Sequence, residues 1–136
     1  MTRPVSDAGA QGSVKEPVRL LLRLEGLTVT LTGLASYVTT GRSWWLMLLF
    51  GLAPDLSFLA YLGGSRAGAA AYNLAHTYVG AIVVAMAGLL TETPLLTHIA
   101  LIWLVHIGVD RALGYGLKFP DAFTSKHLGT IGRVSS

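Results

Sequence analysis

Apolar side chains fall into four long runs that are separated by short polar segments. The runs cover residues 20–38, 44–62, 67–90 and 94–113. Each is close to the roughly 20 apolar residues that a helix needs to cross a bilayer core about 30 Å thick. The pattern therefore predicts an all-α integral membrane protein, a four-helix bundle with up-down topology and short loops.

The polar segments between the runs mark the expected helix ends because they combine Gly, Pro, Ser or Thr with a charged residue. They are residues 39–42, 63–66 and 91–94. We expect one membrane domain over residues 19–117, followed by a cytoplasmic or interfacial tail at 118–136. Residues 1–18 lack the apolar core of a signal peptide, and we expect a disordered tail there.

Composition supports this class. Of 136 residues, 52% are hydrophobic and only 12% are charged, about half the charged share of soluble domains. The mean hydropathy is +0.58. Cysteine is absent, which excludes disulfides and thiolate metal sites.

The net charge of +3 reflects basic residues that flank the apolar runs, so we interpret it as membrane topology and lipid contact, with no nucleic-acid partner. With four spans, one side of the membrane collects Arg3, Lys15, Arg19, Arg23, Arg66, Arg111, Lys118, Lys126 and Arg133. Only Arg42 falls on the other side. The positive-inside rule then predicts a multi-pass inner-membrane protein with both termini cytoplasmic. The Ala and Gly content of residues 67–90 favours close helix packing, and with it a homo-oligomer.

Several ionisable residues fall within the runs, among them Glu25, Asp55, His76, His106 and Asp110. At 1.5 Å per residue, these five lie within about 15 Å of the predicted cytoplasmic ends. A charged group at the bilayer centre costs about 2.5–3.5 kcal/mol, so such residues usually face the bundle interior. We expect them to meet at one depth.

Local spacing adds detail to this expectation. His106 and Asp110 are four residues apart and therefore share a helix face. Pro54 removes a backbone hydrogen bond, which frees a carbonyl one turn earlier and bends the helix beside Asp55.

The predicted site is a metal site. Two imidazoles and two carboxylates suit zinc, manganese, iron or magnesium. The predicted ligands are Asp55, His76, His106 and Asp110. Glu25 is the expected general base on a metal-bound water, and Arg111 with Lys118 is expected to hold a substrate phosphate.

Two alternatives use the same residues. They form either a buried hydrogen-bond network that holds the helices in register, or a proton or cation path in a non-enzymatic carrier or channel. The segment that follows Gly114 is either an exit turn on the membrane or a lid over the site.

Several motifs carry a resemblance. They are Leu22-Arg23-Leu24-Glu25-Gly26, Ala53-Pro54-Asp55-Leu56-Ser57, Tyr72-Asn73-Leu74-Ala75-His76-Thr77 and the stretch from His106 to Lys118. Over about residues 20–129 the chain resembles a bacterial four-helix inner-membrane family, the domain of unknown function 4260 type. The resemblance implies an inner-membrane protein and no particular activity.

A fainter similarity is to membrane-bound metal-dependent hydrolases. Those proteins carry a Pro-Asp, a His-Thr or His-Ser and a His-x-x-x-Asp element in the order found here at Pro54-Asp55, His76-Thr77 and His106 to Asp110. This similarity implies hydrolysis, and the first hypothesis is therefore a metal-dependent hydrolase of a phosphorylated or lipid-linked substrate.

Overall fold

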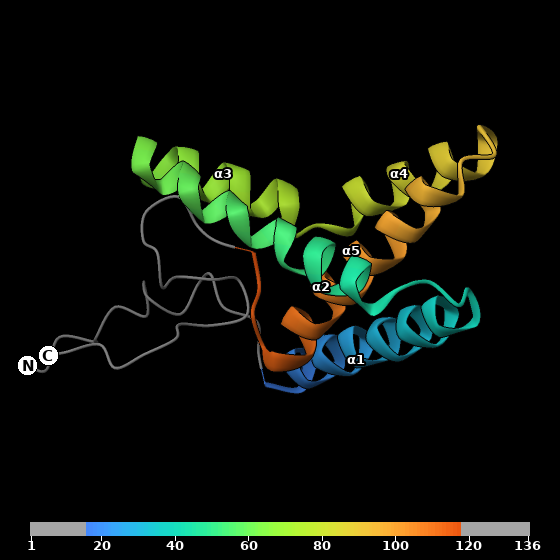
Figure 1. The fold of residues 1–136 in the computed structure, drawn as a ribbon. Coiled ribbons are helices and arrows are strands. Elements are labelled where there is room, and N and C mark those ends of the chain that lie inside the picture. The colour runs from blue at the N-terminus through green and yellow to red at the C-terminus, as the bar shows by residue number, and fades with distance from the viewer. Residues whose placement is uncertain (1–15, 118–136) are drawn as a thin grey trace, which may run out of the picture.

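A computed structural model describes residues 16–117, and all secondary structure in this part is helical (Figure 1). The elements are α1 (Glu16–Thr39), α2 (Trp44–Leu52), the 3-10 helix η2 (Ala53–Gly63), α3 (Ser65–Ala75), α4 (Tyr78–Leu90) and α5 (Pro94–Leu113). The predicted all-α class is confirmed. The predicted N-terminal tail, residues 1–18, lies outside the described part except for its last three residues, which begin α1. Lys118, the C-terminal tail and the segment after Gly114 beyond residue 117 also lie outside it.

Two described helices are long and apolar enough to cross a membrane, namely Trp44–Gly63 (α2 with η2) and Pro94–Leu113. The pair α3 and α4 makes a third when it is counted as one span bent by 44°. The helix α1 is not among them, and it carries Glu16, Arg19, Arg23 and Glu25 within its first ten residues. The expected bundle of four uninterrupted spans is therefore not confirmed.

The helix α5 lies at the centre of the fold, between α1 and α4 (Figure 1). Its packing against α1 depends on two glycines that face each other. A Cβ atom at Gly108 would lie 2.8 Å from the carbonyl oxygen of Gly26, and one at Gly26 would lie 2.8 Å from the carbonyl oxygen of Gly108. Only glycine permits this approach, as is usual where membrane helices pack closely.

Two breaks interrupt the helical backbone. The first lies at Pro54, where α2 passes into the 3-10 geometry of η2. The second lies between α3 and α4, where Thr77 is extended with φ −101° and ψ 146°. Neither Pro nor Gly occupies the second break, so the sequence does not signal it.

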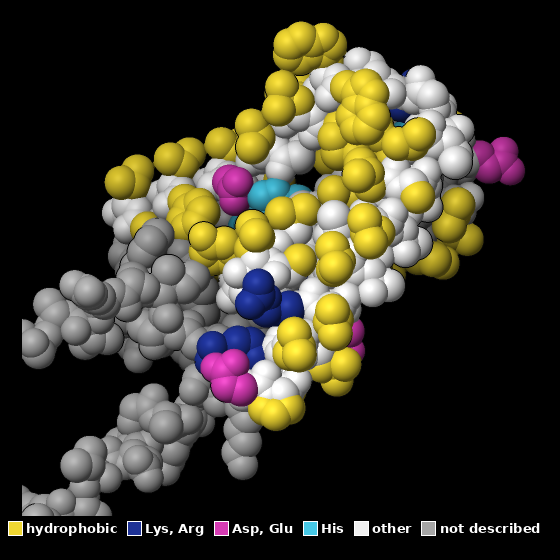
Figure 2. Space-filling view, turned by 90° about the horizontal axis from the view of Figure 1, so that it is seen from below, with side chains coloured by type: hydrophobic (Ala, Val, Ile, Leu, Met, Phe, Trp, Pro, Cys, Tyr) yellow, Lys and Arg dark blue, Asp and Glu magenta, His cyan; other side chains and the backbone are white. Residues whose placement is uncertain are grey.

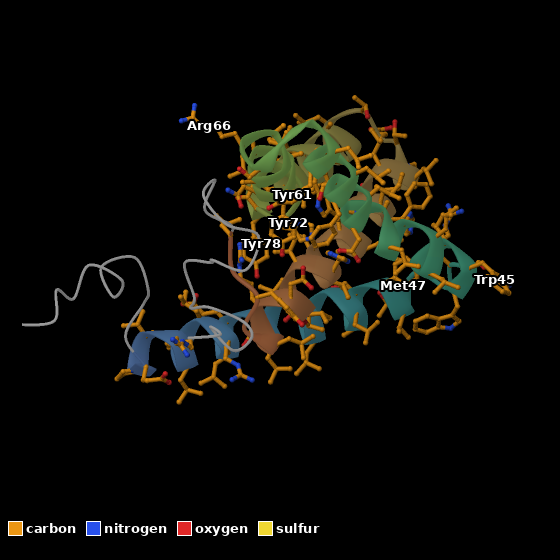
Figure 3. The ribbon with its side chains drawn as sticks, turned by 90° about the vertical axis from the view of Figure 1, so that its left-hand side faces the viewer. Trp45, Met47, Tyr61, Arg66, Tyr72 and Tyr78 are labelled. Carbon is orange, nitrogen blue, oxygen red and sulfur yellow. The ribbon has the colours of Figure 1, made fainter. Side chains whose placement is uncertain are left out.

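Hydrophobic side chains cover much of the outer surface, as Figure 2 shows in yellow. In the span Trp44–Gly63 only Pro54 is fully buried, and the other residues are partly or fully exposed on the molecule. Figure 3 shows Trp45, near the start of this span, and Arg66, just beyond its end, at opposite ends of the molecule. This arrangement fits a span with a tryptophan at one membrane interface and a cation at the other.

We predict that Gly108→Ala destabilises the fold, because the new methyl group would force α1 and α5 apart at a backbone contact. Overpacking of this kind costs about 1–3 kcal/mol. Thermal unfolding of the purified protein in detergent measures the effect. The matched control is Gly63→Ala, whose Cβ would lie at an ordinary 3.6 Å from the Cβ of Ala67. Equal melting temperatures for the two variants would contradict the prediction.

Candidate metal site

The two helix breaks leave backbone carbonyls without their helical partners, and side chains donate to them instead. His106 Nδ1 donates to the carbonyl oxygen of Gly51 at 2.6 Å. Trp103 Nε1 donates to the carbonyl oxygen of Ala75 at 2.6 Å, and Arg111 Nη2 to that of His76 at 2.9 Å. An unsatisfied carbonyl is costly inside a membrane, so these three donors stabilise the broken geometry.

The carbonyl of Gly51 shows how the first break recruits a histidine. Gly51 lies in the last turn of α2, next to the 3-10 helix η2. A 3-10 bond from its carbonyl would need the N–H of Pro54, three residues later, and proline has none. His106 supplies the missing donor from α5. The predicted effect of Pro54 on an earlier carbonyl is thereby accounted for.

These contacts fix the tautomers of both histidines. His76 Nδ1 lies 2.9 Å from the carbonyl oxygen of Tyr72, and a carbonyl only accepts, so Nδ1 carries the hydrogen. The same holds for His106 Nδ1 at the carbonyl of Gly51. In the neutral rings each Nε2 is therefore an acceptor. The two Nε2 atoms face each other at 3.1 Å.

Two carboxylates complete the group. Asp55 Oδ1 lies 3.5 Å from His76 Nε2 and 3.4 Å from His106 Nε2. Asp110 Oδ2 lies 3.3 Å and 3.5 Å from the same two nitrogens. All four atoms lie within 4.8 Å of one another. The four residues come from η2, the break between α3 and α4, and α5, so the fold brings distant segments together at one point.

The four side chains of the site differ in how far they are buried. The side chain of His76 is 1% exposed, that of His106 10%, that of Asp110 20% and that of Asp55 46%. Figure 2 shows histidine side chains in cyan beside an acidic side chain in magenta, visible from the surface. The site is therefore sealed on the histidine side and open beside Asp55.

An aromatic residue holds His76 in place. The ring of Tyr72 stacks on the imidazole of His76 with centroids 3.8 Å apart and an interplanar angle of 12°. Phe58 packs against Tyr72 in turn, at 5.2 Å. Figure 3 shows Tyr61, Tyr72 and Tyr78 in the interior between the helices. Because Tyr72 is buried, the imidazole has little freedom to turn away from the site.

The remaining predicted residues lie elsewhere. Glu25 is exposed on α1 and is not part of the four-residue group. It lines a cavity of about 530 Å³ together with Tyr78 and Arg111. Arg111 lies beside the site, where its Nη2 donates to the carbonyl of His76 and its Nη1 to the carbonyl of Tyr115. Lys118 lies outside the described residues.

Sequence reasoning did not predict the roles of Trp103 and Tyr72 in the site. Trp103 is an ordinary apolar-run residue by pattern, and the four-residue spacing of Tyr72 and His76 placed them on one helix face without indicating that their rings stack. The sequence did predict the end of α5. Gly114 follows its last residue in the left-handed conformation with φ 93°, as expected of a helix-terminating glycine.

Comparison with known proteins identifies one family. The model of a family described as a domain of unknown function (DUF4260) matches residues 19–131, which is most of the chain. No curated protein and no solved structure matches the sequence.

We predict that Trp103→Phe destabilises the protein by about 1 kcal/mol, because it leaves the partly buried carbonyl of Ala75 without a donor while preserving most of the ring volume. The measurement is the apparent melting temperature in detergent. The control is Trp45→Phe, which changes the same atoms on a side chain that is 78% exposed. A loss of stability no larger than that of the control would refute the role assigned to Trp103.

Proposed function

The chain belongs to the DUF4260 family, and from the geometry of its site we propose that it binds one divalent transition-metal ion and uses it to hydrolyse a phosphorylated or lipid-linked substrate. The proposed ligands are Asp55 Oδ1, His76 Nε2, His106 Nε2 and Asp110 Oδ2.

One observation carries the proposal. Four acceptor atoms converge within 4.8 Å, and both histidines have committed their Nδ1 hydrogens to backbone carbonyls. Four acceptors at this spacing repel one another unless a metal ion or protons lie among them. Metal–ligand bonds of about 2.0–2.2 Å in a tetrahedral site place ligand atoms roughly 3.3–3.6 Å apart. The five separations between these atoms that involve a histidine nitrogen are 3.1–3.5 Å.

The ligand set selects among the candidate ions. Magnesium prefers six oxygen ligands and retains several waters, which two buried imidazoles do not provide. Zinc, iron and manganese accept mixed imidazole and carboxylate ligands, and the tetrahedral spacing favours zinc among them. The backbone carbonyls that orient both rings correspond to the outer-shell partners that usually fix metal-binding histidines.

The open side of the site suits catalysis. When bound, such an ion supplies Lewis-acid chemistry and activates water. Asp55 is the most exposed of the four side chains, so water and substrate reach the site on its side. The buried His76 and His106 keep the opposite side closed.

Arg111 is the proposed contact for a substrate phosphate. Two of its N–H groups are engaged by backbone carbonyls, and the guanidinium also lines the cavity beside Glu25. Its planar fork suits phosphate oxygens. Lys118 retains its proposed role as a second phosphate contact. Glu25 lies in this cavity, outside the four-residue group, and we assign it a binding role in place of the general-base role expected from sequence.

The two non-enzymatic interpretations differ from this proposal in one measurable property. A hydrogen-bond network neutralises the four acceptors with protons on the histidines, and a cation path binds its ion only in passing. Neither retains a stoichiometric metal through purification. Metal content therefore separates the proposal from both alternatives.

We predict that the purified protein contains about one zinc, iron or manganese ion per chain and that Asp110→Asn loses it, because an amide oxygen is a weak ligand without charge. Elemental analysis by mass spectrometry measures the content. Asparagine keeps the shape of the side chain and one acceptor oxygen, so a structural network that needs only this acceptor would survive the substitution.

The matched control for metal content is Glu92→Gln, a carboxylate-to-amide change in the turn between α4 and α5. It should retain the full metal content. A folded wild-type protein that carries no metal and takes up none when zinc is supplied would exclude the metal site.

We also predict metal-dependent phosphate release from phosphatidic acid or para-nitrophenyl phosphate, and a loss of about a hundredfold or more in Asp55→Asn. Asp55 is the proposed ligand on the open side of the site. Its loss therefore alters the ion where water and substrate would reach it. Colorimetric phosphate release by the detergent-solubilised protein, with and without a chelator, is the measurement. Equal rates for wild type and Asp55→Asn would show that any release comes from another source.

A further inference from the structure

A continuous groove runs along α1 on the side that faces α4. One end is the cavity of about 530 Å³ that Glu25, Tyr78 and Arg111 line, and the other is a cavity of about 460 Å³ that extends to Ser36. The two cavities share Thr28, Val29 and Tyr78 as lining residues, so they join. The helix α5 forms the floor because it packs against both α1 and α4 (Figure 1).

The two ends of the groove differ in chemistry. From Val29 onwards its walls are largely apolar, with Ile82 from α4 and Leu101 and Leu104 from α5. At the other end an acid and a base line the same cavity. Within residues 16–117 no ion pair joins Glu25 and Arg111. The guanidinium donates to two backbone carbonyls, so three of its five N–H groups and the Glu25 carboxylate are left for a ligand.

Tyr78 lies between the two halves of the groove. Its hydroxyl oxygen is buried and has no hydrogen-bond partner within the described residues. It lines the polar end beside Arg111 and also the apolar end beside Ile82. A buried hydroxyl of this kind normally bonds to something, so the groove offers an unused donor next to the guanidinium.

The length of the groove matches one leaflet of a bilayer. Glu25 and Ser36 are eleven residues apart on one α-helix, which is about 16 Å at 1.5 Å per residue. Half of a hydrocarbon core about 30 Å thick is about 15 Å. An acyl chain that starts at the polar end would therefore reach the end of the groove near the bilayer midplane.

We propose that this groove binds a glycerophospholipid with a primary-amine headgroup, of the phosphatidylethanolamine type. Its phosphate lies at Arg111 and the Tyr78 hydroxyl, its ammonium group at Glu25, and one acyl chain along Val29 and Ile82. The separate acid and base at the mouth match the two charges of this headgroup. An anionic lipid such as phosphatidylglycerol leaves Glu25 unpaired, and the quaternary ammonium of phosphatidylcholine cannot donate a hydrogen bond to it.

The inference rests on the phosphate-binding role proposed for Arg111 and does not depend on the metal. A lipid in this groove would place its phosphate beside Arg111, whose guanidinium donates to the carbonyl of His76. The neighbouring Asp110 is one of the proposed ligands. Asp110→Asn is accordingly expected to lose metal while retaining the lipid.

The test is native mass spectrometry of the full chain in detergent, titrated with phosphatidylethanolamine, phosphatidylglycerol or phosphatidylcholine of identical acyl chains. We expect phosphatidylethanolamine to bind at least about tenfold more tightly than either of the other lipids, the scale of a few charge-assisted hydrogen bonds. Glu25→Gln should remove this preference. Glu16→Gln should keep it, because Glu16 pairs with Arg19 on the same helix outside the groove.

A second pair of variants tests the groove itself. Thr32→Trp fills it, whereas Leu31→Trp places the same side chain one residue away on the exposed face of α1. We expect the first to weaken phosphatidylethanolamine binding about tenfold and the second to change it less than twofold. Equal affinity for the three lipids, or equal effects of the two tryptophan variants, would overturn the lipid site whatever the metal content of the same samples.

Discussion

The structure depends on satisfying backbone carbonyls at two broken helices. A membrane span tolerates a break only where the freed polar groups find partners inside the protein. Here the partners are side chains of α5 for the carbonyls of Gly51, Ala75 and His76. Each break therefore binds its helix to α5, and the same contacts fix how the α3–α4 pair and the α2–η2 pair sit against it.

The proposed metal site follows from this backbone requirement. A histidine has two ring nitrogens, and a neutral one that donates Nδ1–H to a carbonyl presents Nε2 as an acceptor on the other side. His106 does this across helices and His76 within its own turn, so their Nε2 atoms meet at 3.1 Å. The two histidines whose Nδ1–H groups bond to these carbonyls thus bring their acceptor atoms together at one point. A cation at that point would hold both broken helices to α5.

The helix α5 divides these tasks between two faces. Trp103, His106 and Asp110 follow one another at three and four residues and face the broken helices. Val105 and Gly108 lie on the opposite side and contact α1. Arg111 lies between the two faces, where it reaches both the break at His76 and the groove beside Glu25. Close backbone packing on one face leaves the other face free to carry polar side chains at a fixed depth.

The sequence by itself determined the helical class, the location of the apolar runs and the choice of Asp55, His76, His106 and Asp110, because ionisable residues are expensive in apolar helices and therefore conspicuous. It also located the first break, since proline lacks an N–H. The tertiary structure alone decided that α3 and α4 separate at His76, that Trp103 and Arg111 satisfy the freed carbonyls, and that Glu25 lies in a groove apart from the four ligands. No local residue type at His76 and Thr77 signals a break. Its position follows from donors on another helix, and the packing of α5 is what brings them there.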